Sequence, residues 1–208
     1  MTKINKDIVK AGYNTISNEY LAARTKNSRD VQLLEELVQR LPRGARILDA
    51  GCGAGVPITR LLSQHFEVVG VDFSEAQIKL AQQLVPEAQF VCEDMTELSF
   101  QDATFDAICS YYAIIHVPRQ EHKTIFRQFF RLLKPSGLAL LCLGADDLDD
   151  DIVEDYMGVK MYWSHYDVET NLAMLADCGF EPIWSRVVED ASCPGSGHLF
   201  VLLQKKRA

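Results

Sequence analysis

The chain has 208 residues, 48% of them hydrophobic and 24% charged, with a formal net charge of −8. This length suits one domain with a full core, and we expect residues 1–208 to form a single domain. The excess of acid argues against a protein built to hold nucleic acid, because such proteins gather Lys and Arg on one surface. No apolar run is long enough to cross a bilayer, and the N-terminus lacks the apolar core of a signal peptide. We therefore expect neither a nucleic-acid nor a membrane partner.

Six cysteines are scattered singly along the chain, with no C-x-x-C pair: Cys52, Cys92, Cys109, Cys142, Cys178 and Cys193. Most lie in apolar runs, where a free cysteine behaves as a small hydrophobic residue. This pattern favours a reducing, cytoplasmic compartment and no metal site. A reactive thiol at Cys52 or Cys109 is the less favoured alternative.

The chain alternates helical patterns with short apolar runs typical of strands. Residues 1–40 predict two helices. Strands are then expected at Arg46–Ala50, Phe66–Asp72, Gln89–Glu93, Phe105–Tyr111 and Leu138–Leu143, with helices at Pro57–Gln64, Glu75–Leu84 and Arg119–Leu133. Nearly all-apolar strands separated by helices predict an α/β fold, a parallel sheet with helices on both faces.

The C-terminal third predicts one helix, "DVETNLAMLADCGF", followed by the strand-like runs "EPIWSRVVED" and "HLFVLLQ". Their link, "ASCPGSG", is too short for a helical crossover, so the last strand should run antiparallel in a sheet of about seven strands. Residues 1–40 and 144–166 stand outside the alternation. We expect a helical lid and a substrate-side insertion there, both at the carboxyl edge of the sheet, where open α/β proteins bind ligands.

Three glycines follow the first expected strand in "RILDAGCGAGV": Gly51, Gly53 and Gly55. Glycines here let the backbone approach a ligand closely, and the strand–turn–helix context is typical of cofactor sites. The G-x-G-x-G spacing differs from the dinucleotide fingerprint G-x-G-x-x-G. On its own, the loop is equally consistent with a plain strand-to-helix turn.

Acidic residues at three strand ends make the cofactor interpretation stronger. Asp72 is placed to accept hydrogen bonds from ribose hydroxyls. Asp94 could accept from an adenine amino group while Met95 packs on the ring. Asp49, just before the glycines, fits a ligand with an ammonium group better than one with a pyrophosphate. The pattern indicates a ligand that contains an adenosine and a cation.

The motifs "ILDAGCGAG", "VVGVDFSEAQIKLAQ", "FVCEDMTELSFQDATFDAICSYYAIIHV" and "FFRLLKPSGLALL" resemble those of the class I S-adenosylmethionine-dependent methyltransferases, in their small-molecule "type 11" branch. The resemblance implies a Rossmann-like fold, S-adenosylmethionine as cofactor and S-adenosylhomocysteine as product. It also implies the cofactor contacts: the loop with Gly51, Cys52, Gly53 and Gly55 for the methionine part, Asp72 for the ribose, Asp94 and Met95 for the adenine, and Ser110 and Tyr111 at the methionine end. Phe73 is expected to be a further cofactor-binding residue.

One residue departs from the family's usual "LKPGG", since Ser136 takes the place of the first glycine. We expect Ser136 to be tolerated there if this turn residue has a negative φ.

The N-terminal segment "AGYNTISNEYLAARTK" places Tyr13, Ile16, Tyr20 and Ala23 on one helical face, with Arg24 close by. The helix could simply pack its aromatic residues on the core. We favour a lid in which Tyr13 or Tyr20 covers the cofactor and Arg24 meets its carboxylate, because the family commonly closes its site with an N-terminal helix.

His116 follows the fourth expected strand and is the candidate general base, since His accepts protons near neutral pH. Phosphobase methyltransferases, which this motif resembles locally, pair a His at this position with a lid tyrosine, and Tyr13 is the candidate partner here. The alternative is a packed core histidine. In the insertion, Tyr162, Trp163, His165 and Tyr166 could line a substrate pocket or dock the lid. The insertion's acidic run is interpreted as a solvated face, with attraction of a cationic or amine acceptor as the less favoured alternative. His122 and His198 are interpreted as structural or surface residues.

The sequence therefore predicts an S-adenosylmethionine-dependent methyltransferase (EC 2.1.1.-) acting on O or N of a small-molecule acceptor. An RNA- or protein-modifying methyltransferase and a non-catalytic cofactor-binding protein stay open as alternatives, because a fold does not name the acceptor. The oligomeric state also stays open.

Overall fold

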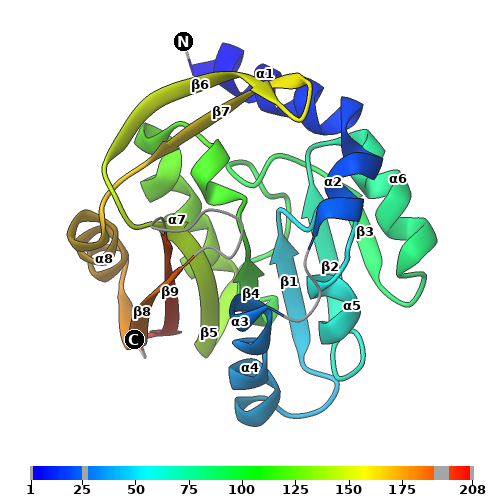
Figure 1. The fold of residues 1–208 in the computed structure, drawn as a ribbon. Helices are drawn as coiled ribbons and strands as arrows, with labels where there is room; N and C mark the ends of the chain where they lie inside the picture. Colours follow the sequence, from blue (N-terminus) through cyan, green and yellow to red (C-terminus); the bar gives the residue numbers. More distant parts are fainter. Residues whose placement is uncertain (1, 25–27, 190–196, 207–208) are drawn as a thin grey trace.

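The computed structural model describes residues 2–24, 28–189 and 197–206, so Cys193, most of the "ASCPGSG" link and Arg207 lie outside the described residues. A seven-stranded sheet in the order β3-β2-β1-β4-β5-β9-β8 forms the centre of the molecule (Figure 1). Its strands are β1 (Arg46–Ala50), β2 (Glu67–Asp72), β3 (Gln89–Cys92), β4 (Phe105–Ser110), β5 (Leu133–Gly144), β8 (Phe180–Glu189) and β9 (Gly197–Lys205).

The strand directions confirm the expected topology. β1, β2, β3, β4 and β5 pair in parallel, whereas β9 pairs antiparallel with both β5 and β8. Only the last strand is reversed. A mostly parallel sheet with helices around it is the predicted Rossmann-like methyltransferase fold.

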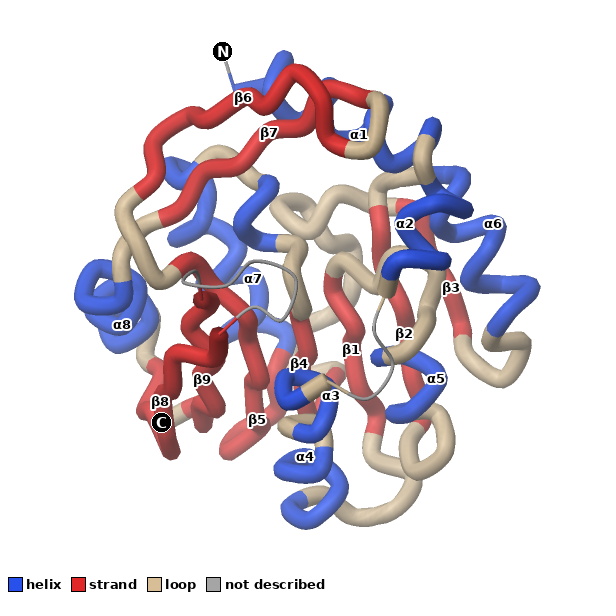
Figure 2. The backbone as a smooth tube through the Cα atoms, viewed as in Figure 1, coloured by secondary structure: helices blue, strands red, loops and turns tan. Residues whose placement is uncertain are grey.

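Helices cover the sheet and its carboxyl edge (Figure 2). They are α1 (Thr2–Thr15), α2 (Ser17–Ala23), α3 (Arg29–Gln32), α4 (Glu35–Arg40), α5 (Ile58–Leu62), α6 (Glu75–Leu84), α7 (His122–Leu132) and α8 (Val168–Asp177), with short 3-10 turns at Ile114–His116 and Arg119–Glu121. One core cluster holds Phe126 and Phe129 of α7 with Leu175 of α8, and another holds Leu37 of α4 with Leu62 of α5. The helices thus form two layers, each closed by its own apolar cluster.

The N-terminal region differs from the expected pair of helices, because four helices occupy it. Ile16, with φ −99° and ψ 19°, separates α1 from α2. Farther along, Val31 of α3 and Leu37 of α4 are buried in the sheet's core. Only α1 and α2 therefore lie over the carboxyl edge of the sheet. The apolar periodicity of residues 1–40 does not distinguish the helices that cover the sheet edge from those that pack in the core.

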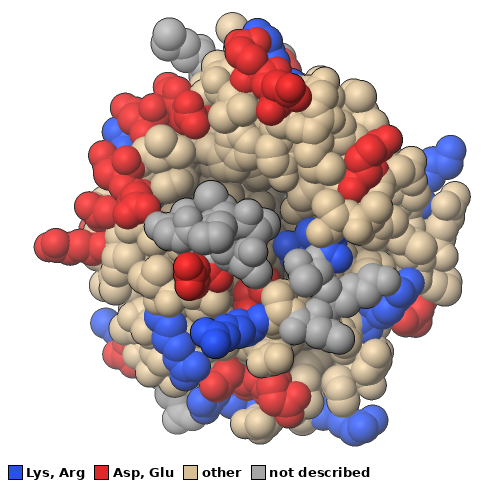
Figure 3. Space-filling model, viewed as in Figure 1, with Lys and Arg blue, Asp and Glu red and all other residues tan. Residues whose placement is uncertain are grey.

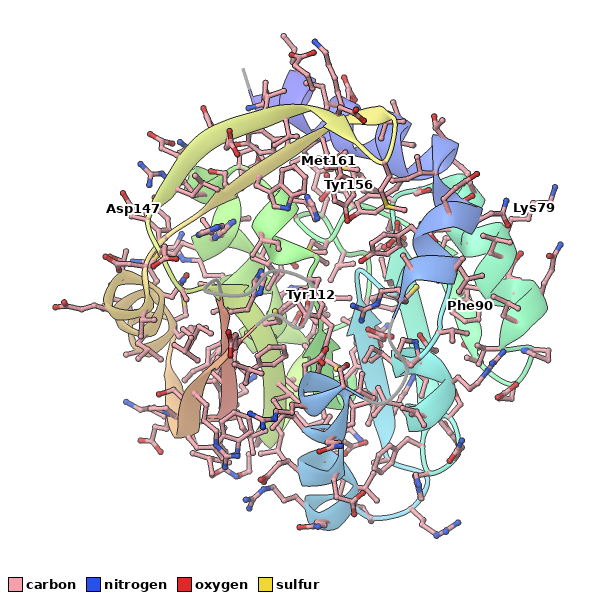
Figure 4. The ribbon with its side chains drawn as sticks, viewed as in Figure 1. Lys79, Phe90, Tyr112, Asp147, Tyr156 and Met161 are labelled. Carbon is pink, nitrogen blue, oxygen red and sulfur yellow. The ribbon has the colours of Figure 1, made fainter. Side chains whose placement is uncertain are left out.

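The insertion between β5 and α8 is a two-stranded hairpin of β6 (Leu148–Tyr156) and β7 (Val159–His165). It arches over the sheet beside α1 (Figure 1). Val9 and Ile16 pack with Met161 and Tyr162 in an apolar cluster, and Figure 4 shows Met161 and Tyr156 between the hairpin and the helix. The two segments that the sequence sets apart thus pack on each other above the strand ends.

Ser136 contradicts the expectation of a negative φ, since its φ is +64°. The left-handed region costs a residue with a Cβ about 1–2 kcal/mol. The turn before the apolar part of β5 is therefore strained at the position where a glycine is usual.

Candidate active site

A cleft of about 630 Å³ opens at the carboxyl ends of β1, β2 and β4, beneath α1 and the hairpin. Figure 3 shows a hollow in this face, with mainly uncharged residues along its upper border. A smaller recess of about 420 Å³ shares Tyr20, Gly51, Gly53 and Tyr111 with it. Parallel strands bring the residues at their carboxyl ends to one edge, which is why the predicted positions converge here.

The glycine loop forms one wall of the cleft. Gly51 has φ +77°, and a Cβ built on it would collide with the side chain of Ala113. Gly53, with φ +53°, donates its N–H to Asp72 Oδ2 at 3.0 Å. Gly55 has a different role, because a Cβ there would meet Val85 and Phe90, against α6 and β3. Gly55 lines neither cavity, and its lack of a side chain serves the packing of the loop.

Asp72 ends β2 and faces the cleft. Its Oδ2 accepts from Gly53 N, and its Oδ1 accepts from Ser74 N at 2.9 Å. Burial raises the pKa of Asp72 to about 6, with the two backbone hydrogen bonds opposing the rise. A carboxylate oxygen has two lone pairs, so both oxygens keep acceptor capacity toward a ligand.

Asp49 lies at the smaller recess with only 1% of its surface exposed. Its Oδ2 accepts from Thr59 Oγ1 at 2.6 Å. Burial raises the pKa of Asp49 to about 7, against the hydrogen bond from Thr59 and the positive charge of Arg24. Arg24 lines the same recess and lies over the Tyr112 ring, 4.9 Å from its centroid. One acid and one guanidinium thus face the recess.

Asp94 and Met95 line the other end of the cleft. Asp94 Oδ1 accepts from Thr96 N and Thr96 Oγ1, while Oδ2 pairs with Lys6 Nζ at 2.9 Å. Lys6 Nζ also pairs with Glu121 at 2.6 Å. Burial acts to raise the pKa of Asp94, but the bonds from Thr96 and Lys6 outweigh it and lower the pKa. Lys6, which the sequence did not single out, therefore ties α1 to the expected adenine site.

His116 and Tyr13 meet at the wall of the cleft, as a hydrogen bond of 2.9 Å joins Tyr13 Oη to His116 Nε2. His116 Nδ1 lies 2.8 Å from the carbonyl oxygen of Tyr162. A carbonyl can only accept, so Nδ1 carries the proton and Nε2 accepts from the tyrosine hydroxyl. Burial lowers the pKa of His116 to about 4, with the carbonyl opposing the change, so the imidazole is neutral at physiological pH.

The four insertion residues that were expected to line a substrate pocket or dock the lid lie in different positions. The Trp163 ring lies 5.2 Å from that of His116, next to the cleft. Tyr162 is fully buried, and its hydroxyl donates to Asp150. His165 packs on Gly144, and Tyr166 lies under Arg119 and beside His122. None of the four lines the cleft.

A sequence model described as "Methyltransferase domain" matches residues 47–137. The chain is 30% identical over 151 residues to the Bacillus subtilis methyltransferase YqeM, covering 67% of this chain and 61% of that protein. It is 33% identical over 152 residues to phosphoethanolamine N-methyltransferase 3 of Arabidopsis thaliana, covering 69% of this chain and 30% of that protein. The chain belongs to the class I S-adenosylmethionine-dependent methyltransferases.

Solved structures share the fold of this chain across nearly its whole length. Burkholderia thailandensis 1,6-didemethyltoxoflavin-N1-methyltransferase, with bound 1,6-didemethyltoxoflavin and S-adenosylhomocysteine, superimposes with a TM-score of 0.77 at 20% identity, covering 99% of this chain and 91% of that one. The [4+2]-cyclase SpnF gives a TM-score of 0.71 at 18% identity, covering 96% of each chain. One fold thus carries different activities.

Some expected site residues of the methyltransferase lie away from both cavities. Ser110 is fully buried and donates its hydroxyl to Ala50 O at 2.8 Å, beneath the cleft. Tyr111 lines both cavities, and its hydroxyl donates to Asp30 O. Its neighbour Tyr112, with φ +54°, also lines the cleft, and the strand-end position next to Tyr111 was the signal that could have indicated it. Phe73 and Tyr20 line the cleft, and Cys52 the recess, where they were expected.

The thiols of Cys52 and Cys109 are buried, and burial raises the pKa of both well above the usual value. A reactive thiolate is therefore disfavoured at either position. Within the described ranges, no three His, Cys, Asp or Glu side chains are grouped to hold a metal ion. None of the described helices has the length and apolar character needed to span a membrane.

Proposed function

We propose that this methyltransferase binds S-adenosylmethionine in the cleft and transfers its methyl group to an oxygen or nitrogen of a small-molecule acceptor. The observation that carries the proposal is the pair of Tyr13 and His116, whose hydrogen bond lies at the wall of the cavity that Asp72 lines. A proton acceptor and a ribose-binding acid in one cavity suit methyl transfer to a group that must lose a proton.

The cavity walls fit the cofactor part by part. Asp72 would accept from the ribose hydroxyls, and Asp94 and Met95 would hold the adenine. Asp49 would meet the ammonium, and Arg24 the carboxylate. The collision of a Gly51 Cβ with Ala113 shows how little room the loop leaves for side chains on that wall. When bound, S-adenosylmethionine supplies an electrophilic methyl group on a sulfonium and leaves as the neutral thioether S-adenosylhomocysteine.

Tyr13 and His116 would take the proton of the acceptor. An acceptor O–H or N–H would give its proton to Tyr13 Oη, and the Tyr13 hydroxyl proton would move to His116 Nε2 along their hydrogen bond. The imidazolium that forms keeps its Nδ1–H bond to the Tyr162 carbonyl. Because burial lowers the pKa of His116 to about 4, the imidazolium would give this proton up to solvent and return to the neutral form.

A small acceptor is favoured over a nucleic acid by the shape and charge around the cleft. α1 covers the cavity, and β6 carries exposed acidic residues, as does Asp147 just before it, which Figure 4 places at the outer side of the molecule. A polyanion would be repelled there. One relative is named for phosphoethanolamine and one fold neighbour for 1,6-didemethyltoxoflavin, and both compounds are small molecules.

Turnover with a panel of acceptors tests the proposal. The wild-type protein is incubated with S-adenosylmethionine and amines, phenols, heteroaromatic N–H compounds or hydroxy acids, and S-adenosylhomocysteine and product mass are measured. We expect at least one acceptor to give a product about 14 Da heavier, the net gain when a methyl group replaces a hydrogen. Cofactor binding without turnover for any acceptor would favour the non-catalytic alternative, and turnover only on RNA or protein would favour the other.

The His116 variants test the proton route. We expect His116→Ala to keep cofactor affinity within a few-fold but to lower turnover at least ~10²-fold, the low end for a positioned base. Tyr13→Phe should lower turnover as well, and the double variant should be little worse than either single one, because the two groups act as one unit. Near-normal turnover of folded His116→Ala would make His116 a packing residue, with catalysis resting on proximity alone.

A further inference from the structure

Gln77 carries a buried amide that has no hydrogen-bond partner within the described part of the chain. It lies in the first turn of α6 with 1% of its surface exposed. Neither Oε1 nor Nε2 has a partner, so exchanging the two atoms would not satisfy the group. An unpaired buried amide destabilises a fold, so this one needs a reason.

The unpaired amide lies at the wall of the cleft, beside the acid that ends β2. Gln77 lines the cleft together with Asp72 and Phe73. Its Oε1 is 3.8 Å from the position that a Cβ would take on Gly53, the residue whose N–H binds Asp72. The amide and the carboxylate therefore face the same small volume of the cleft.

The backbone that carries Gln77 is held from both sides. Ser74 Oγ accepts from Gln77 N at 3.2 Å and donates to Asn14 Oδ1 at 2.6 Å. Asn14 Oδ1 also accepts from Ala76 N at 3.2 Å, which fastens α1 to the start of α6. With its helix turn fixed and α1 above it, the amide is preorganised toward the cleft.

We propose that Gln77 is a cofactor-binding residue that donates Nε2–H to a ribose hydroxyl oxygen of the nucleoside. This inference rests on the proposed function. The two groups are complementary. Ionised Asp72 can only accept hydrogen bonds, so it accepts them from the ribose hydroxyls, whereas the oxygens of the same hydroxyls need a hydrogen-bond donor. Gln77 supplies that donor, and its Oε1 can accept in turn. Together, Asp72 and Gln77 recognise the two hydroxyl groups of the ribose.

One substitution at Gln77 should raise the stability of the ligand-free protein and at the same time weaken cofactor binding. Gln77→Met keeps a similar length and removes the unpaired polar atoms. The ligand-free variant should therefore unfold at a higher temperature, by about 2–4 °C for a chain of this size. Its affinity for S-adenosylhomocysteine should fall about tenfold, because the hydroxyl loses its donor.

Calorimetric titration and thermal unfolding of the wild type, Gln77→Met and Gln82→Met test the role of Gln77. Gln82→Met is the matched control, because Gln82 lies on the same helix and is exposed. S-adenosylhomocysteine is titrated at pH 8, followed by adenosine, 2′-deoxyadenosine and 3′-deoxyadenosine. We expect Gln82→Met to match the wild type in both measurements. Gln77→Met should also lose part of the wild-type preference for adenosine over a deoxynucleoside.

The outcomes separate this inference from the proposed function. Unchanged S-adenosylhomocysteine affinity and unchanged deoxynucleoside preference in Gln77→Met would overturn the role of Gln77 and leave the proposed function standing. Absence of S-adenosylhomocysteine binding to the wild type would overturn both. If Gln77→Met does not fold, Gln77→Glu is titrated instead, since it keeps the volume but lacks the donor at pH 8. Wild-type affinity in that variant would likewise refute the inference.

Discussion

Asp49 and Asp72 titrate close to neutral pH, because burial raises their pKa values to about 7 and about 6. Both values lie above the ordinary 3.8, so the ligand-free protein loses stability at these sites as the pH rises from about 4 through 6 and 7. Cofactor binding should show the opposite trend. The ammonium and the ribose hydroxyls need ionised carboxylates, and protonated ones must first lose a proton.

We therefore predict that S-adenosylhomocysteine affinity rises with pH and levels off above about 8. Between pH 8 and pH 5.5 the affinity should fall by more than about tenfold, as expected for a group with a pKa near 7 that must be ionised. Asp49→Asn should bind more weakly at pH 8 but show a much flatter profile, measured by calorimetry. An equally steep profile in that variant would show that Asp49 does not meet the ammonium.

Ser136 offers a stability prediction with an internal control. Ser136→Gly should raise the free energy of unfolding by about 1 kcal/mol, because glycine adopts the φ of +64° without a steric penalty. Ser136→Ala keeps the Cβ and hence the strain, so it should not be stabilised. Urea unfolding of both variants provides the measurement. Stabilisation by Ala as large as that by Gly would assign the effect to the lost hydroxyl instead.

Residues at strand ends could be predicted from the sequence because chain direction places them at one edge, as it does Asp49, Asp72 and Asp94. Gln77 and Lys6 could not be predicted in this way. Gln77 stands in a helical pattern in which any polar residue is ordinary, and its significance comes from being buried without a partner. Lys6 reaches Asp94 across 88 positions of sequence, a contact that no local pattern encodes.

Among the elements, the hairpin of β6 and β7 packs on α1, places Trp163 beside His116 and is the proposed acceptor side. Trp163 contacts the His116 ring, whereas Tyr166 packs on Arg119 and His122, away from the cleft. Trp163→Ala should raise the acceptor KM or lower turnover while S-adenosylhomocysteine affinity stays within a few-fold. Tyr166→Ala is the matched aromatic control and should change acceptor kinetics less.

Steady-state kinetics with a positive acceptor from the panel, together with calorimetry, decide this prediction. Loss of cofactor binding in Trp163→Ala with normal acceptor kinetics would place the hairpin on the cofactor side. Equal kinetic losses in both variants would mean that the hairpin acts only through its overall packing.

The sheet could be predicted from its apolar runs because buried parallel strands carry a strong continuous signal. The hairpin could not, since β6 is exposed along almost its whole length and rich in Asp, a residue that strands disfavour. Its pairing with β7 and the packing of Tyr162 and Met161 on α1 outweigh that preference. The break at Ile16 was hidden for a related reason, because α1 and α2 present one apolar face to the same cluster.

The whole molecule consists of two parts, the central sheet with its packed helices and the layer of α1, α2 and the hairpin. The sheet and the helices packed on it hold the strand ends in register. α1, α2 and the hairpin form a second part, which is fastened to the turns around the cleft by Lys6 on Glu121, Asn14 on Ser74 and Ser164 on Arg119. The cleft lies where these parts meet, with a carboxylate, an aromatic dyad and a glycine loop facing one volume. This arrangement explains why the predicted cofactor residues come from widely separated segments.

Calorimetric titration of S-adenosylhomocysteine into the wild-type protein and into Asp72→Ala tests this arrangement most directly. The wild type should bind one molecule per chain, and folded Asp72→Ala should bind it more weakly by about 1–3 kcal/mol, the cost of leaving ligand hydroxyls unpaired. Titration of NAD, which carries a pyrophosphate in place of an ammonium, should give no binding. Equal S-adenosylhomocysteine affinity in the two proteins, or no binding to the wild type, would contradict the assignment of the cleft.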